Sequence, residues 1–201
     1  MVAISAATAY LTGITDTQPE HVVTVRTTDG GEHWYRLVEP CTDRGALASM
    51  DAARLWLFCG DEPSTSDQSA QLYRSTDGGH HWTLVADTGT PFVSEPARHQ
   101  LGNLPTVGYL PQLVAWPTGE LYMARQKFGL VAHSADGGTS WTELLGDDGA
   151  GGYHLVVLND TVIWARSTGC LWQTRSGGQH WTLMNTRAGY ACASPPPKGA
   201  Q

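Results

Sequence analysis

Short apolar runs alternate with turn residues along the whole chain. Residues 113–116 and 121–124 are two such runs joined by a Pro-Thr-Gly turn, and residues 153–158 and 162–165 repeat this arrangement around an Asn-Asp turn. Apolar runs of four to six residues bounded by Gly, Pro, Asn and Asp are typical of β-strands and tight hairpins, whereas helices need longer stretches. The sequence therefore predicts an all-β protein.

An eight-residue pattern recurs four times among these runs, beginning at residues 27, 75, 134 and 174. Each copy, called a box below, starts with Ser or Thr, has two adjacent glycines and ends in Trp; the third residue is Asp, replaced by Ser in the fourth copy. The defining residues are Thr27, Asp29, Gly31 and Trp34; Ser75, Asp77, Gly79 and Trp82; Ser134, Asp136, Gly138 and Trp141; and Thr174, Ser176, Gly178 and Trp181. The tryptophans are 48, 59 and 40 residues apart, and apolar runs flank every box. Four repeats of this length predict a β-propeller, or part of one, built from four four-stranded antiparallel blades.

The repeats divide the chain into blades at about residues 1–40, 41–90, 107–148 and 150–186 of a propeller that spans 1–190. Residues 86–108 form an insertion between the second and third blades, and residues 191–201 form a C-terminal tail. Four blades are few for a propeller, so self-association that completes a ring is one possible arrangement. Further blades upstream and a small closed ring of four are the alternatives.

The pattern Ser/Thr-x-Asp-x-Gly-x-x-Trp resembles the Asp-box, or bacterial neuraminidase repeat, and the resemblance covers about residues 2–186. Such boxes occur in sialidases, xyloglucanases and related endoglucanases, sortilin-type receptors and photosystem II assembly-factor-like propellers. The paired glycines and the box in every blade look more like the xyloglucanase and assembly-factor branches. The resemblance implies a propeller with the boxes on its outer rim, away from the central pocket, and is not specific for any one activity.

The box residues suit a structural role. Two glycines permit the positive φ of a tight turn, the Asp carboxylate can accept backbone N–H groups, and the tryptophan ring can pack between blades. The neighbouring histidines, His33, His80, His81 and His180, lie on separate turns, so we expect them to be solvated and expect no metal site.

Charge and composition exclude several partners. The 12 Lys and Arg residues and the 19 Asp and Glu residues give a net charge of 12 − 19 = −7. The cations are also scattered along the chain, which argues against binding to nucleic acid or to anionic membrane surfaces. No apolar run approaches the ~18–20 residues of a membrane span, and the first residues lack the basic region of a signal peptide. Phosphate-binding loops and metal-binding motifs are absent from the sequence, so no cofactor is expected.

The sequence favours a non-catalytic module that binds a protein or a glycan. Glycosidases need two facing carboxylates, but the expected inner strands contain no acid, and the Arg-Ile-Pro motif of sialidases is absent. The alternative is a fragment of a sialidase-like or xyloglucanase-like glycoside hydrolase whose catalytic residues lie partly in other blades. Candidate binding residues are Glu95, Arg98 and His99 in the insertion, and Arg125 and Arg166, which occupy matching positions at the ends of the second strands of the third and fourth blades.

The four cysteines form two neighbouring pairs, Cys41 with Cys59 and Cys170 with Cys192. Bonding within each pair is reasonable for a blade, although four cysteines allow three connectivities and strands also bury free thiols. Together with the extracytoplasmic habit that the resemblance implies, pairing favours a secreted or periplasmic protein.

Overall fold

The computed structural model describes residues 1–15, 22–41, 44–60, 69–89, 101–106, 109–126, 129–146, 151–186 and 192. These residues form strands and turns, and none of them is in a helix. The strands make four antiparallel four-stranded sheets, one for each predicted blade. The described part therefore contains no helix that is long and apolar enough to cross a membrane.

Each sheet is a meander whose strands are hydrogen-bonded in chain order. The first blade contains β1 (Val2–Ala3), β2 (Ala9–Ile14), β3 (Val22–Thr27) and β4 (Tyr35–Arg36). The second contains β5 (Arg44–Ser49), β6 (Leu55–Gly60), β7 (Ala70–Ser75) and β8 (Thr83–Asp87). The third contains β9 (Gln112–Ala115), β10 (Leu121–Arg125), β11 (Leu130–Ser134) and β12 (Thr142–Leu145). The fourth contains β13 (His154–Val157), β14 (Ile163–Arg166), β15 (Cys170–Thr174) and β16 (Trp181–Thr186).

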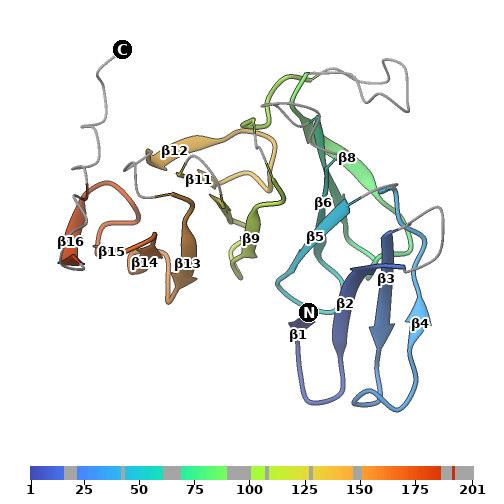
Figure 1. The fold of residues 1–201 in the computed structure, drawn as a ribbon. Helices are drawn as coiled ribbons and strands as arrows, with labels where there is room; N and C mark the ends of the chain where they lie inside the picture. Colours follow the sequence, from blue (N-terminus) through green and yellow to red (C-terminus); the bar gives the residue numbers. More distant parts are fainter. Residues whose placement is uncertain are drawn as a thin grey trace.

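The four blades follow one another along an arc, with the first and the fourth at opposite ends (Figure 1). The first strands of the blades lie on the inner side, because β5 contacts both β1 and β9, and β13 contacts β9. Each box connects the third strand of its blade with the outermost fourth strand. The boxes therefore lie on the outer part of each blade.

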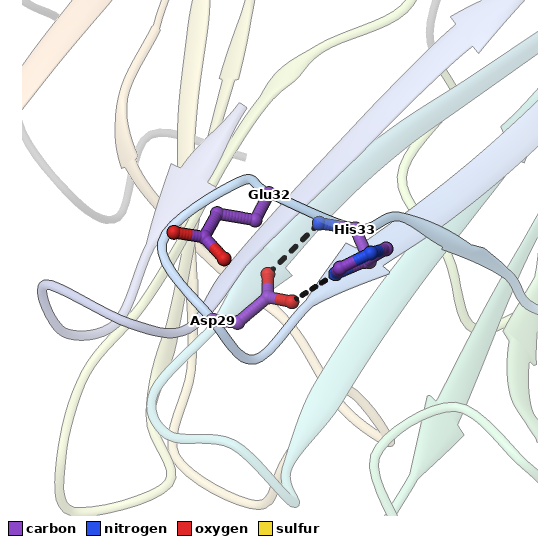
Figure 2. Close-up of side chains that lie close together, drawn as sticks. All are labelled: Asp29, Glu32 and His33. Atoms are coloured by element: carbon purple, nitrogen blue, oxygen red, sulfur yellow. Dashed lines mark hydrogen bonds and ion pairs between the residues drawn. The ribbon is translucent and has the colours of Figure 1, made fainter.

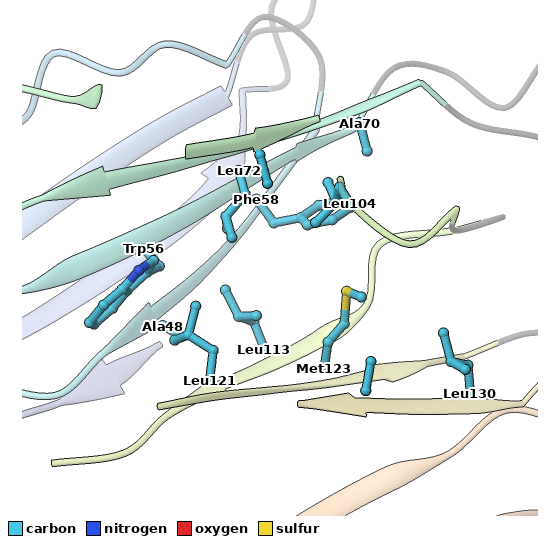
Figure 3. Packing of buried hydrophobic residues seen from close by; sticks show 12 residues of the cluster. Ala48, Trp56, Phe58, Ala70, Leu72, Leu104, Leu113, Leu121, Met123 and Leu130 are labelled. Carbon is cyan, nitrogen blue, oxygen red and sulfur yellow. The ribbon is translucent and has the colours of Figure 1, made fainter. Parts of the chain in front are cut away.

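The hydrophobic core lies between neighbouring blades. In Figure 3, Trp56, Phe58 and Leu72 of the second blade face Leu121 and Met123 of the third, and all five side chains are almost completely buried. Similar clusters fill the junctions between the first and second blades and between the third and fourth. Each blade therefore depends on its neighbours for the burial of its apolar side chains.

Alternation along the second strand decides which neighbour a side chain meets. Leu121 and Met123 belong to the cluster shared with the second blade, whereas Tyr122 and Ala124 belong to the cluster shared with the fourth. This is the two-residue period of a strand that is buried on both faces. Below, the side of a blade that points toward the blade before it is its preceding face, and the opposite side is its following face.

Disulfides join Cys41 to Cys59 and Cys170 to Cys192. The first lies at the junction of the first two blades, where both cysteines are buried beside Leu57. The second holds Cys192 against the beginning of β15. Two disulfides suggest an oxidising, extracytoplasmic environment.

Candidate functional site

The hydrogen bonds of each box lie within its own turn. In the second box, the Ser75 hydroxyl accepts the Gly79 N–H at 2.9 Å and donates to Asp77 Oδ1 at 2.8 Å. The same Asp77 oxygen accepts the backbone N–H groups of His80 and His81 at 3.0 and 2.9 Å. The Ser and Asp side chains thus satisfy the donors of a turn whose glycines, Gly78 and Gly79, have positive φ.

Two of the box histidines also bind the box carboxylate, which the sequence interpretation did not foresee. Nδ1 of His33 lies 2.7 Å from Asp29 Oδ2, and Nδ1 of His81 lies 2.6 Å from Asp77 Oδ2. The hydrogen bond from the backbone N–H of each histidine is the main reason why the pKa of the aspartate lies well below its usual range, and the contact with the histidine ring is the second. The signal in the sequence was the four-residue spacing between Asp and His.

The third box uses a serine in the same place. The Ser140 hydroxyl donates to Asp136 Oδ2 at 2.6 Å, and this bond is the main reason why the pKa of Asp136 falls to about 2. A carboxylate held ionised by several donors is a poor general acid. The geometry therefore supports a structural role for the box aspartates.

The first box brings together three side chains of metal-ligating types. Figure 2 shows Asp29 joined to His33 by two hydrogen bonds, with the Glu32 side chain beside them. All three are exposed, and the Asp29–His33 bond recurs in the second box, where His80 replaces the glutamate. The turn itself therefore accounts for the Asp–His pair.

The two candidate arginines on strand ends do not share a surface. In the third blade, the first box residue Ser134 pairs with Leu121, the first residue of β10, and Arg125 is the fifth residue of β10. In the fourth blade, the first box residue Thr174 pairs with Ile163, the first residue of β14, and Arg166 is the fourth residue of β14. Because strand side chains alternate, Arg125 belongs to the preceding face of its blade and Arg166 to the following face. The apparent match in the sequence is thus one residue out of register.

The insertion between the second and third blades has a fixed base. The buried carboxylate of Asp87 accepts the N–H groups of Gly89, Leu101 and Gly102 at 2.8–2.9 Å. The Asn103 side chain donates to the Thr139 carbonyl of the third box at 2.6 Å. The two ends of the insertion are therefore held together at this blade junction, while the candidates Glu95, Arg98 and His99 lie outside the described residues.

A groove of about 280 Å³ lies on the outer part of the junction between the first and second blades. This groove, called the rim groove below, is lined by Arg26, Thr28, Tyr35, Arg36, Leu37, Val38 and His80. It was not among the sites predicted from the sequence, because its lining combines residues of the first blade with His80 of the second. Its distinctive features are its arginines and its exposed aromatic and apolar side chains.

Arg26 is the central cation of the rim groove. Its guanidinium carbon lies 5.6 Å from the centre of the Tyr10 ring, and the hydroxyl of this buried tyrosine donates to the Ala52 carbonyl at 2.7 Å. The Arg26 Nε is buried, and it has no hydrogen-bond acceptor among the described residues. Arg26 is therefore oriented by packing on Tyr10, and its Nε–H donor is unsatisfied.

The corresponding groove at the next junction differs in charge. It has a volume of about 240 Å³, and Arg74 occupies the position of Arg26. Its lining includes the ionised carboxylate of Asp136, while Arg54 is already paired with Asp51 at 2.7 Å. The Asp136 carboxylate would therefore repel an anion bound in this groove, whereas no carboxylate of the described residues lines the rim groove.

Comparison with known proteins identifies the fold. No family model matches the chain, and no curated protein matches it by sequence. A structure of YCF48 bound to a D1 peptide is 18% identical with a TM-score of 0.53, covering 90% of this chain and 52% of that one. A nidogen/laminin complex gives 13% identity and a TM-score of 0.60, covering 92% and 62%. The GH74 xyloglucanase from Xanthomonas campestris is 18% identical with a TM-score of 0.56, and the match covers 95% of this chain and 32% of that one.

The chain is a β-propeller. The architecture predicted from the repeats is thus confirmed, including its likeness to a xyloglucanase. The propeller described here spans about half to three fifths of the length of the first matched structures, 52% and 59% for the two YCF48 chains.

Most carboxylates of the described part of the propeller are engaged in local bonds. Asp51 accepts the N–H groups of Ala53 and Arg54 in a turn, and Glu39 accepts the Thr24 hydroxyl at 2.9 Å. Burial raises the pKa of Glu39 above its ordinary value. The inner strands β1, β5, β9 and β13 contain no Asp or Glu, so they supply no carboxylate pair of the kind glycosidases use.

Proposed function

We propose that this β-propeller is a non-catalytic, extracytoplasmic module that binds a partner protein, with the rim groove recognising an acidic segment of that partner. The observation that carries the proposal is Arg26, which lines the groove and whose buried Nε has no hydrogen-bond acceptor among the described residues. The two disulfides support the extracytoplasmic part of the proposal. A glycan carrying carboxylates offers the same chemistry and is the second ligand to test.

The chemistry of the rim groove suits a carboxylate beside an apolar side chain. Arginine presents a planar fork of donors that matches a carboxylate, and packing over Tyr10 already restricts Arg26, which lowers the entropic cost of binding. The Arg36 side chain is 65% exposed and adds a second cation, which lies 4.0 Å from the buried Glu39 carboxylate in a looser pair than the 2.7 Å contact of Arg54 with Asp51. Tyr35 and Val38 are 60% and 77% exposed, which gives the groove aromatic and apolar contact area.

Charge further favours an acidic ligand at this place. The chain carries a net charge of −7, so a cluster of cations is a local exception on an acidic protein. Electrostatic complementarity of this kind increases association rates and selects the orientation of a ligand. The peptide complex of YCF48 supports the view that a propeller of this fold can bind a peptide.

The test uses a fluorescein-labelled peptide of alternating Glu and Ala, with a Gln-Ala peptide as its uncharged control. We expect fluorescence anisotropy to detect binding of the acidic peptide alone, weakening as salt screens the charges. Arg26→Gln should weaken binding about tenfold, the loss of one charge-assisted hydrogen bond. Arg74→Gln is the matched control, because it removes the equivalent arginine from the groove that contains Asp136. Equal effects of both variants, or no binding by the wild type, would reject the rim groove as the site.

The alternative of a glycoside hydrolase fragment is favoured by the likeness to the xyloglucanase. Its test is turnover of xyloglucan and of an aryl sialoside, with Glu95→Gln and Asp51→Asn as variants. Turnover that either variant abolishes would replace the binding proposal. Because Asp51 already accepts two backbone N–H groups and the Arg54 side chain, we expect Asp51→Asn to disturb the turn rather than any chemistry. Glu95, Arg98 and His99 remain proposed as further ligand contacts.

A further inference from the structure

The junctions between blades repeat one contact. The aliphatic residue three positions after a box tryptophan packs on the second box glycine of the next blade. The pairs are Leu37 with Gly79, Val85 with Gly138, and Leu144 with Gly178. A side chain at these glycines would collide with Leu37 at Gly79, with Leu72 at Gly138 and with Leu144 at Gly178. Two box tryptophans also reach back across a junction, since the indole N–H groups of Trp82 and Trp181 donate to the carbonyls of Val38 and Leu144 at 2.8 and 2.9 Å.

The following face of the fourth blade has the same residues without a neighbour. Met184 stands three positions after the box tryptophan Trp181 and is 48% exposed, although its equivalents pack on the next blade. Val156, on the same face of β13, is 58% exposed. Trp164 occupies the position at which Trp56 donates its indole N–H into the next blade, but Trp164 forms no such bond within the described residues.

The preceding face of the first blade is open in the complementary way. Gly31 corresponds to the three covered glycines, yet a Cβ there would meet only the Trp34 ring of its own box. Trp34 is 42% exposed. Leu11 is 43% exposed, whereas its equivalents on the preceding faces of the other blades are completely buried. These equivalents are Leu57, Met123 and Ala165.

The geometry points to a second copy of this chain as the occupant of both faces. The internal junctions define what covers a following face, namely a box hairpin with an accessible second glycine, and the first blade carries such a hairpin uncovered. Exposed apolar side chains at both ends are unlike the polar outer faces that cap soluble repeat arrays. The fourth blade of each copy packs on the first blade of the other, so two equal head-to-tail junctions close one ring.

The size of a ring is consistent with two copies. One chain covers 52% and 62% of two of the matched propeller structures, so two copies would supply as much chain as the first of them contains and about a quarter more than the second. Two head-to-tail contacts related by a twofold axis close without leaving a free face, whereas an open series would continue to grow. The inferred assembly is therefore a closed dimer of this chain.

The oligomeric state tests this inference directly. Light scattering after size exclusion, together with sedimentation velocity over a dilution series, should show a species of twice the 21.6 kDa chain mass. Met184→Glu, on the fourth blade, and Leu11→Glu, on the first, should each weaken dimerisation about 100-fold by placing a charge in an apolar junction. Both residues are half-exposed in the single chain, so circular dichroism should show unchanged folding.

Val38→Glu is the matched control, because Val38 is an apolar residue that is 77% exposed on the rim and lies on neither open face. It should leave the dimer unchanged. Mixing Met184→Glu with Leu11→Glu should restore association in part, because the mixed dimer keeps one wild-type junction. A dimer joined through two fourth blades would instead be insensitive to Leu11→Glu. A wild-type chain that stays monomeric at every concentration, or that grows into larger open assemblies, would overturn the closed dimer.

Discussion

Replacing box tryptophans distinguishes stabilisation at a blade junction from stabilisation within a single turn. Trp82 is partly buried between the first two blades, and its indole N–H donates to the Val38 carbonyl at 2.8 Å. Trp34 has the same place in its own box but is 42% exposed and forms no such bond within the described residues. Replacing Trp82 and replacing Trp34 therefore remove the same residue of the motif, but only Trp82 contacts a neighbouring blade in the described part of the chain.

The structure gives the expected magnitudes. Trp82→Ala returns roughly 150 Å² of buried surface to water, which at ~25 cal/mol/Å² amounts to about 4 kcal/mol as an upper value. Partial exposure reduces this figure, and loss of the indole bond adds ~1 kcal/mol, so we expect the free energy of unfolding to fall by about 3 kcal/mol. Trp34→Ala removes packing on one turn only, and we expect a loss of about 1 kcal/mol.

Urea unfolding followed by far-ultraviolet circular dichroism measures both losses, because the midpoint and slope of the transition, rather than the signal amplitude, give the free energy of unfolding. The comparison is made in the Met184→Glu background, which keeps association from covering Trp34. Trp82→Phe isolates the indole bond and should cost about 1 kcal/mol. Equal losses for Trp82→Ala and Trp34→Ala would show that the tryptophans act within their own turns, and the description of the junction would then be wrong.

Three further predictions concern the turns and their charges. The bonds to Asp77 lower its pKa, so the stabilisation they give is complete above the ordinary pKa of about 4 and is lost progressively as the pH falls below it. Asp77→Asn should flatten this loss in acid unfolding curves. Glu39→Gln should steepen it, because the raised pKa of Glu39 favours the folded state on acidification. Gly138→Ala should lower the free energy of unfolding by about 2–3 kcal/mol, because it adds a close contact at the blade junction to the strain of a residue with a φ of 101°. Gly119→Ala is the control: its φ is 99°, but the space around it is open, so the loss should be about 1 kcal/mol. Thermal unfolding measures both. Ser176→Asp should raise stability by about 0.5 kcal/mol by restoring the Asp–His bond of the first two boxes, and a loss of stability would mean that the fourth turn has a different geometry.

The blades could be predicted from the sequence because their decisive interactions are local. The hydrogen bonds of Ser75 and Asp77 stay within the turn, and the hairpins at either side connect strands that are neighbours in the chain. Four repeats of such a unit fix the number of strands and their antiparallel order. Even the Asp77–His81 bond, which was not predicted, could have been found from the spacing of the two residues.

Only the tertiary structure decided which environment each copy of the motif has. Trp34 and Trp82 are equivalent in sequence, but one borders an open face and the other a neighbouring blade. The register placed Arg125 and Arg166 on opposite faces, and the packing of two blades formed the groove around Arg26. The physical reason is that a blade's turns are built from its own residues, whereas its faces are buried, paired or exposed according to what packs against them.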